Sequence, residues 1–208
     1  MTPLEILGIP QSNFVRAVRM ACEEKALPYE LKPLMPHDPE VLAIHPLGKV
    51  PVLRHGEVGV AETRAIVAYL DATFPETPVI PKAPEAAART EAWVSMIGTA
   101  IDRALIRDYG LAYVIPTGPD GAPDRQVIDA ALPEVQAKID LLDDAVSRSD
   151  YLAGDTFTFA DMSLMPMLAF MRTLPESGAM MAKAKALTAY YDRNATRPSF
   201  VNTTPPAS

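Results

Sequence analysis

Some polar side chains stand at predicted helix starts, where they can either cap the helix or bind an anion. Ser12 precedes a helical pattern that runs to about Ala26, with Val15, Val18 and Cys22 on its apolar stripe. A serine hydroxyl at such a position either caps the helix or donates a hydrogen bond to an anion. The unpaired N–H groups and the positive dipole end of the helix would stabilise the same anion. The residue types alone leave both roles open.

A second helix start carries an acid and a hydroxyl side by side, at Glu62 and Thr63. The backbone amides at such a start suit a carboxylate ligand, although simple capping explains the same two residues. Just upstream, Lys49 is either an anion ligand or a solvated lysine. Pro51 follows Val50 at the beginning of a short β-branched run, and by itself it indicates only the start of a strand.

The elements that must position these residues form a mixed α/β pattern. The order β-α-β-α-β-β-α is predicted, with strands at 4–9, 29–34, 50–53 and 58–60, and helices at 12–26, 62–74 and, weakly, within 36–44. The first βαβ unit implies a parallel pair of strands. The turn at 55–57 implies a closing antiparallel hairpin.

Four closely spaced prolines then mark a linker, and the pattern changes to helices only. The linker prolines are Pro75, Pro78, Pro81 and Pro84. Helices are predicted at 85–113, 125–148, 159–174 and 182–194, and Thr158 with Asp161 is typical of a capping box. We expect residues 198–208 to form a mobile polar tail. The predicted fold class is α/β followed by all-α, with domains at 1–77 and 86–208 and a linker at 78–85.

The net charge and the cysteine content limit the binding partners and the thiol chemistry that we expect. The net charge is −7 and the pI about 5.0, so a phosphate backbone would be repelled and nucleic acid is excluded as an expected partner. Cys22 is the only cysteine; it falls on an apolar stripe and is expected to be a core residue. No signal peptide or membrane span is indicated, so the expected location is the cytoplasm.

Five segments resemble motifs of the cytosolic glutathione transferase family, in the family's order and spacing. They are IPQSNFVRAVR at 9–19, HPLGKVPVL at 45–53, AETRAI at 61–66, FTFADMS at 157–163 and RPSF at 197–200. The second resembles the family's NP-x-GKVP-x-L pattern and the third its ES-x-AI pattern, with Thr63 replacing the serine. The serine near the first helix is similar to the theta, zeta, phi and tau branches and to many bacterial members.

The resemblance implies a thioredoxin-like N-terminal domain that binds glutathione, with Ser12 as the catalytic residue that stabilises the thiolate. It also implies a cis peptide bond before Pro51, which lets the Val50 backbone pair with the cysteinyl part of glutathione. Glu62 and Thr63 would hold the γ-glutamyl end, and Lys49 or His37 the glycyl carboxylate. The expected glutathione-binding residues are Ser12, Asn13, Phe14, His37, Lys49, Val50, Pro51, Glu62 and Thr63.

The second substrate is expected in the helical domain. Phe14, Ile106, Tyr109 and Tyr113 are the expected electrophile-binding residues; the alternative for the two tyrosines is that they are ordinary aromatics on a helix face. The resemblance implies a homodimeric, detoxifying enzyme with glutathione as co-substrate and no metal, conjugating glutathione to hydrophobic electrophiles. A peroxidase, dehalogenase, etherase or isomerase reaction with glutathione remains an alternative, and so does a non-catalytic binding or regulatory protein.

Overall fold

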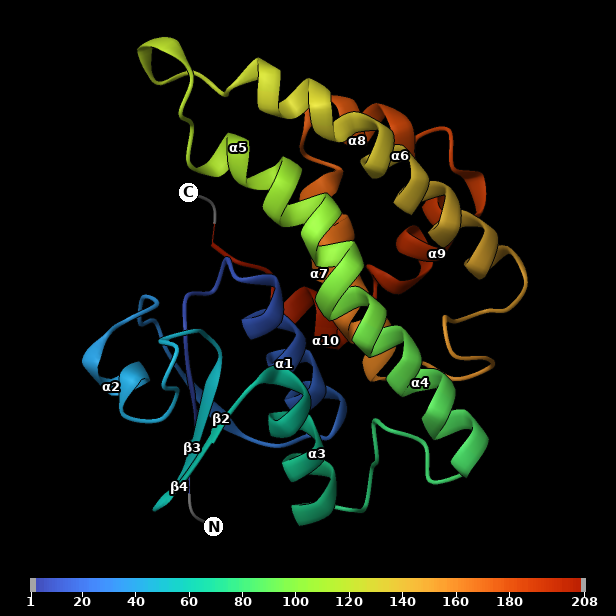
Figure 1. Cartoon of the computed structure of the whole chain (residues 1–208). Coiled ribbons are helices and arrows are strands. Elements are labelled where there is room, and N and C mark those ends of the chain that lie inside the picture. The colour runs from blue at the N-terminus through green and yellow to red at the C-terminus, as the bar shows by residue number, and fades with distance from the viewer. Residues whose placement is uncertain (1–2, 207–208) are drawn as a thin grey trace.

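A four-stranded sheet forms the N-terminal part of the computed structural model, which describes residues 3–206 (Figure 1). The strands lie in the order β2-β1-β3-β4; β1 is parallel to β2, and the other neighbours are antiparallel. Their bounds are Leu4–Leu7 for β1, Tyr29–Lys32 for β2, Val52–His55 for β3 and Val58–Ala61 for β4. The predicted parallel pair and closing hairpin are therefore confirmed.

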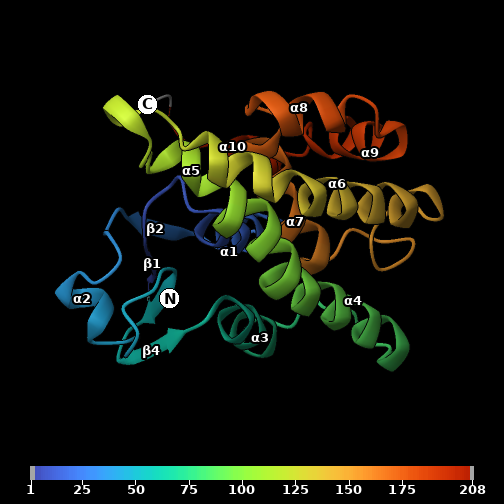
Figure 2. The ribbon, with the colours of Figure 1, turned by 45° about the horizontal axis from the view of Figure 1, so that its top comes forward.

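Three helices complete the predicted order β-α-β-α-β-β-α, namely α1 (Asn13–Glu24), α2 (Pro39–Leu42) and α3 (Thr63–Thr73). Figure 2 shows α1 between the sheet and α7 (Phe159–Met171) of the second domain. Cys22 is fully buried there, as predicted, and burial raises the pKa of its thiol to about 12. This thiol therefore stays protonated and unreactive in the folded protein.

The second domain contains helices and no named strand within residues 3–206. Its longest helical run is continuous (Figure 1). The winding of this run changes to π-helical in the middle. This run consists of α4 (Pro84–Met96), η1 (Ile97–Ile101), η2 (Arg103–Gly110) and α5 (Leu111–Val114). The remaining helices are η3 (Pro119–Gly121), α6 (Arg125–Ser147), α7, α8 (Pro175–Met181), α9 (Lys185–Asn194) and α10 (Pro198–Asn202).

The predicted capping box of α7 is confirmed, and it forms the polar centre of the helical core. Asp161 is fully buried and its carboxylate accepts hydrogen bonds from the Thr158 and Leu152 N–H groups at 2.8 and 3.0 Å. The Tyr190 hydroxyl donates to the same carboxylate at 2.8 Å. One side chain thus joins the start of α7, the preceding loop and α9.

The prediction of a mobile C-terminal tail is wrong for the described residues, which reach 206. Residues 198–202 form α10, which packs against α1. The Arg16 guanidinium lies over the Phe200 ring at 3.9 Å from its centroid and donates to the Phe200 carbonyl at 2.9 Å. Composition indicated a tail because most of these residues are polar or proline. The segment is ordered instead by an arginine more than 180 positions earlier.

A buried ion pair holds the segment between the two parts of the chain. Lys25 Nζ lies 2.8 Å from Asp71 Oδ1 and donates to the carbonyls of Phe74 and Thr77. Asp71 in turn accepts from the Ile80 N–H at 2.8 Å. The linker prolines therefore lie on a fixed path, while the exact domain bounds stay a prediction. None of the helices within residues 3–206 has the length and apolar character needed to cross a bilayer.

Candidate active site at the edge of the sheet

Three segments that the sequence singles out meet at one edge of the sheet. The strand register places Leu7 opposite Val52, and Val52 opposite Ala61. The end of β1, the start of β3 and the end of β4 therefore lie side by side. Since Ser12 follows β1 and Glu62 follows β4, the register brings both to the edge where β3 begins.

The backbone at Gly8 holds the start of α1 close to the start of β3. Gly8 has a φ of +153°, a conformation that side chains rarely adopt. A Cβ built there would lie 2.5 Å from Val15 Cγ2 and 3.0 Å from Val50 Cβ. Only glycine fits between these two side chains, so the loop that ends at Ser12 passes directly beside Val50.

Ser12 is half-buried and caps α1, but its bond to the helix is long. Its Oγ accepts from the Val15 N–H at 3.4 Å. No acceptor within residues 3–206 takes the proton of its hydroxyl. Capping uses a lone pair and leaves the O–H free to donate, so both roles predicted for Ser12 are compatible at this one position.

The Val50–Pro51 peptide bond is cis, as the resemblance implies. Val50 stands just before β3, and its N–H and C=O have no backbone partner among the described residues. A backbone donor and acceptor that are unpaired beside a strand are what an added peptide strand would use. Whether Val50 binds a ligand in this way stays a prediction.

Glu62 does not cap α3, contrary to the simple capping interpretation of this pair. It occupies the N-cap position with a φ of +70°, and its side chain makes no hydrogen bond to the helix. Its carboxylate is 67% exposed and lies 3.2 Å from Nε2 of His45. Thr63, the first residue of α3, is half-buried. A carboxylate and a hydroxyl thus stand next to unpaired helix amides.

Lys49 and His37 lie together near this edge. The His37 N–H donates to the Gly48 carbonyl at 2.8 Å, and the His37 ring packs against Gly48, next to the exposed Lys49. Burial raises the pKa of Asp102 in the helical domain, while the positive charges of Arg107 and Lys49 lower it. The charge of Lys49 in the first domain thus acts on a buried acid of the second.

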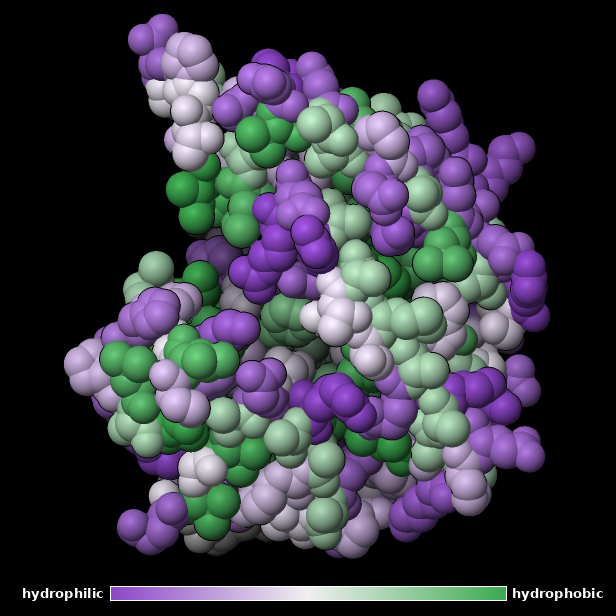
Figure 3. Space-filling model, in the orientation of Figure 1, coloured by the Kyte–Doolittle hydropathy of each residue, from purple (hydrophilic) through white to green (hydrophobic). Residues whose placement is uncertain are grey.

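The first turn of α1 holds two further predicted residues. Asn13 and Phe14 are both half-buried, and Phe14 packs on the main hydrophobic core. Figure 3 shows a hollow between the lobe with the sheet and α2 and the lobe that ends in α5, with apolar side chains gathered near the end of α5. Val114 and Ile115 at this end are 58% and 63% exposed. Neither residue was among the expected electrophile contacts, although their position just before a glycine- and proline-rich loop could have indicated them.

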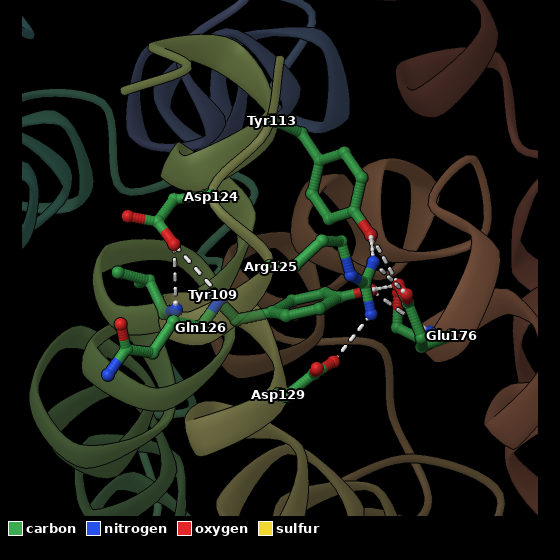
Figure 4. Close-up of polar contacts among 9 residues, drawn as sticks. Tyr109, Tyr113, Asp124, Arg125, Gln126, Asp129 and Glu176 are labelled. Carbon is green, nitrogen blue, oxygen red and sulfur yellow. Dashed lines mark hydrogen bonds and ion pairs between the residues drawn. The ribbon is translucent and has the colours of Figure 1, made fainter. Parts of the chain in front are cut away.

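The structure argues against Tyr109 as an electrophile contact, which corrects that prediction. Tyr109 has no exposed surface; its hydroxyl donates to Glu176 at 3.0 Å and accepts from the Ser177 N–H (Figure 4). The Tyr113 hydroxyl also donates to Glu176. Both tyrosine hydroxyls are therefore engaged within the helical domain. Ile106 is 8% exposed and Tyr113 is half-buried, so a ligand contact for these two stays a prediction.

Glu176 is the centre of this cluster, and its charge is expected to stabilise the fold. It forms an ion pair with Arg125 at 2.6 Å in addition to its bonds with Tyr109 and Tyr113. Burial raises the pKa of Glu176, but the hydrogen bonds from Tyr113 and Arg125 outweigh it and lower the pKa to about 2. An unfolded glutamate has a pKa of about 4.3. The stabilisation is thus complete above about pH 5 and is lost as the pH falls toward 2.

We expect Glu176→Gln to lower the free energy of unfolding by about 1–3 kcal/mol at pH 7. The difference from wild type should shrink between about pH 5 and pH 2, where the wild-type carboxylate is protonated. Urea unfolding at a series of pH values measures this. Glu85→Gln is the matched control, because Glu85 is exposed and also follows a proline in the first turn of its helix. A difference that stays constant down to pH 2 would contradict the role assigned to the Glu176 charge.

Both parts of the chain are similar to known proteins. The sequence model of the glutathione S-transferase N-terminal domain matches residues 7–78, and that of the C-terminal domain matches residues 125–193. Glutathione S-transferase 3 of Zea mays is 30% identical over 98% of this chain and 94% of its own length. Glutathione S-transferase GstB of Escherichia coli K12 is 28% identical, over 94% and 95%.

Solved structures agree with these relatives. The theta class glutathione S-transferase of Xanthomonas axonopodis pv. citri, solved with glutathione bound, has a TM-score of 0.83 and 26% identity. The match covers 100% of this chain and 99% of that one. Fold and site thus define a two-domain protein with a thioredoxin-like N-terminal domain and a helical C-terminal domain, as predicted. The chain belongs to the glutathione S-transferase family.

Proposed function

We propose that the protein binds glutathione at the sheet edge defined above and conjugates its thiol to hydrophobic electrophiles. The observation that carries the proposal is the strand register that brings Ser12, Val50 and Glu62 together, with the Ser12 hydroxyl proton unused among the described residues. The transferase names of the relatives in both sequence and structure support the same reaction. No observation favours the peroxidase, dehalogenase, etherase, isomerase or non-catalytic alternatives.

The chemical task of Ser12 is to hold the thiol of glutathione as its anion. A free thiol has a pKa of about 8.5, and only the thiolate attacks electrophiles well. The Ser12 hydroxyl donates a hydrogen bond to the sulfur, and the start of α1 directs its unpaired N–H groups and positive dipole end toward the same atom. The thiol proton passes to solvent. The sulfur then forms a C–S bond while the leaving group departs with its bonding electrons.

The other glutathione contacts follow from the chemistry of each end of the tripeptide. The Val50 N–H and C=O pair with the cysteinyl backbone beside the cis Pro51. Glu62 takes the γ-glutamyl ammonium group, and Thr63 with the amides of α3 takes the γ-glutamyl carboxylate. Lys49 takes the glycyl carboxylate.

The remaining residues of the proposed site lie beside Lys49, in the first turn of α1 and around the electrophile. His37 lies beside Lys49 and supports it, and Asn13 and Phe14 line the first turn of α1 next to the sulfur. Phe14, Ile106 and Tyr113 then border the electrophile, together with the exposed Val114 and Ile115. We also propose a homodimer in the cytoplasm; light scattering from the purified protein tests the dimer.

The direct test is to titrate bound glutathione. The ultraviolet absorbance of the thiolate, recorded against pH in the complex, should give a thiol pKa about one to two units below that of free glutathione. Activity with a chlorodinitrobenzene should follow the same curve. A bound thiol that titrates like free glutathione would favour the non-catalytic binding protein. A protein that does not bind glutathione at all would contradict the proposed function.

A further inference from the structure

Both ring nitrogens of His45 are engaged, and this residue belongs to no role proposed so far. His45 is 3% exposed and lies between α2 and β3. Its Nδ1 accepts from the Leu47 N–H at 3.1 Å. Its Nε2 lies 3.2 Å from Oε1 of Glu62. Because the Leu47 N–H needs an acceptor at Nδ1, the neutral ring carries its proton on Nε2 and donates it to the Glu62 carboxylate.

The backbone fixes this ring in place. The His45 N–H donates to the Val41 carbonyl, and the His45 carbonyl accepts from the Gly48 N–H, both at 2.8 Å. A buried side chain held on the backbone and at both ring nitrogens is a rigid support. The Glu62 side chain, in contrast, is largely exposed and makes no hydrogen bond to its own helix. His45 is therefore the contact that sets where the Glu62 carboxylate stands.

We propose that His45 is a positioning residue, which holds Glu62 for the ammonium group of glutathione and so creates a preference for ligands with a free α-amine. The inference rests on the proposed function of this edge. The family pattern NP-x-GKVP-x-L has asparagine where this chain has His45. Nε2 contacts one carboxylate oxygen, Oε1; the other remains available to an ammonium group.

The test compares two ligands, glutathione and its N-acetyl derivative, in which the amine is masked. Calorimetry with the full-length protein measures both affinities. Wild type should prefer glutathione by at least about tenfold, since a hydrogen bond to a charged group has this magnitude. His45→Leu should lose most of this preference by weakening glutathione alone, and His45→Gln, which keeps an N–H donor, should restore part of it. KM for glutathione should rise about tenfold in His45→Leu, with kcat little changed, because Ser12 activates the thiol.

His55→Leu is the matched control. His55 is a half-buried histidine of β3 whose Nδ1 lies 2.8 Å from the Tyr69 hydroxyl, outside the proposed site. It should keep the wild-type preference for glutathione. Thermal unfolding of each variant shows whether it folds. If His45→Leu does not fold, Glu62→Gln serves instead, since it removes the carboxylate from an exposed position and should lose the same preference.

The outcomes separate this inference from the proposed function. Failure of the wild-type protein to bind glutathione would contradict both the proposed function and this inference. Binding with an unchanged ligand preference in His45→Leu would overturn only the inference, whereas an unchanged preference in Glu62→Gln would also overturn the ammonium contact proposed for Glu62. An equal loss of affinity for both ligands in a folded His45→Leu would show a purely structural role and would overturn it as well.

Discussion

Replacing Ser12 with alanine is expected to raise the pKa of bound glutathione by about one to two units and to lower kcat/KM about 10- to 100-fold near neutral pH. A hydrogen bond to a charged group contributes roughly 1.5–3 kcal/mol, and each pKa unit corresponds to about 1.4 kcal/mol. Below the thiol pKa, the fraction of thiolate falls tenfold for each unit. The helix start would remain and keep part of the effect. Thiolate absorbance and steady-state kinetics over a pH series measure both quantities.

Two further variants separate the thiolate role of Ser12 from its capping role. Alanine removes the cap at the Val15 N–H as well, which should lower the free energy of unfolding by about 1 kcal/mol. Ser12→Asp keeps a good cap but loses the donor and adds a negative charge, so it should be stable and inactive. Ser12→Thr keeps cap and hydroxyl and should keep measurable activity. A stable Ser12→Asp enzyme with wild-type kcat/KM would show that the hydroxyl is not the activating group.

The elements of the first domain were predictable because their sequence signals are local. The apolar run from Leu4 to Ile9 between two prolines predicted β1, and Ser12 before an apolar stripe predicted α1. In the helical domain, the predicted helix over 85–113 is confirmed within a residue or two at each end. The sequence pattern did not predict the change to π-helical winding inside this helix.

The short helices α8 and α10 were not predicted, because helices of this length are stable only through packing. α10 depends on Arg16, and α8 on Tyr109, whose hydroxyl accepts from the Ser177 N–H at 3.2 Å. Such partners lie outside any local window. The same limit applies to Glu62, where the sequence left capping open and the structure has a contact with His45 instead.

The site was predictable as a set of segments, but not as a geometry. The resemblance identified Ser12, Val50 and Glu62, and the register of β1, β3 and β4 brings them to one edge. Periodicity could not tell which face of the long helix borders the second substrate. Tyr109 lies on the face that is buried against Glu176, whereas Val114 and Ile115 are exposed.

The largest effect on stability is expected from Asp161→Ala, which should lower the free energy of unfolding by about 3–5 kcal/mol. The change removes the acceptor of four buried donors, namely the N–H of Leu152, the N–H and the hydroxyl of Thr158, and the hydroxyl of Tyr190. Each buried donor left without a partner costs about 1–3 kcal/mol, and water cannot replace the carboxylate without entering a packed core. Urea unfolding followed by circular dichroism measures the loss.

Asp140→Ala is the matched control for this variant. Asp140 is an exposed residue of α6, and among the described residues its carboxylate accepts only from Gln136 one turn earlier. Its replacement should change stability by no more than about 0.5 kcal/mol. A comparably small effect of Asp161→Ala would show that the buried donors find other partners, and the capping box would then not be the polar centre of this domain.

A double-mutant cycle with Tyr190→Phe tests how the Asp161 carboxylate acts. Alone, Tyr190→Phe removes one hydrogen bond and should cost about 1 kcal/mol. Once Asp161 is alanine, the same change removes a hydroxyl that has lost its acceptor, so it should cost nothing or even stabilise the protein. The two losses must therefore be non-additive, with a coupling of about 1–3 kcal/mol. Additive losses would mean that α7 and α9 are held together by apolar packing alone, and not through this carboxylate.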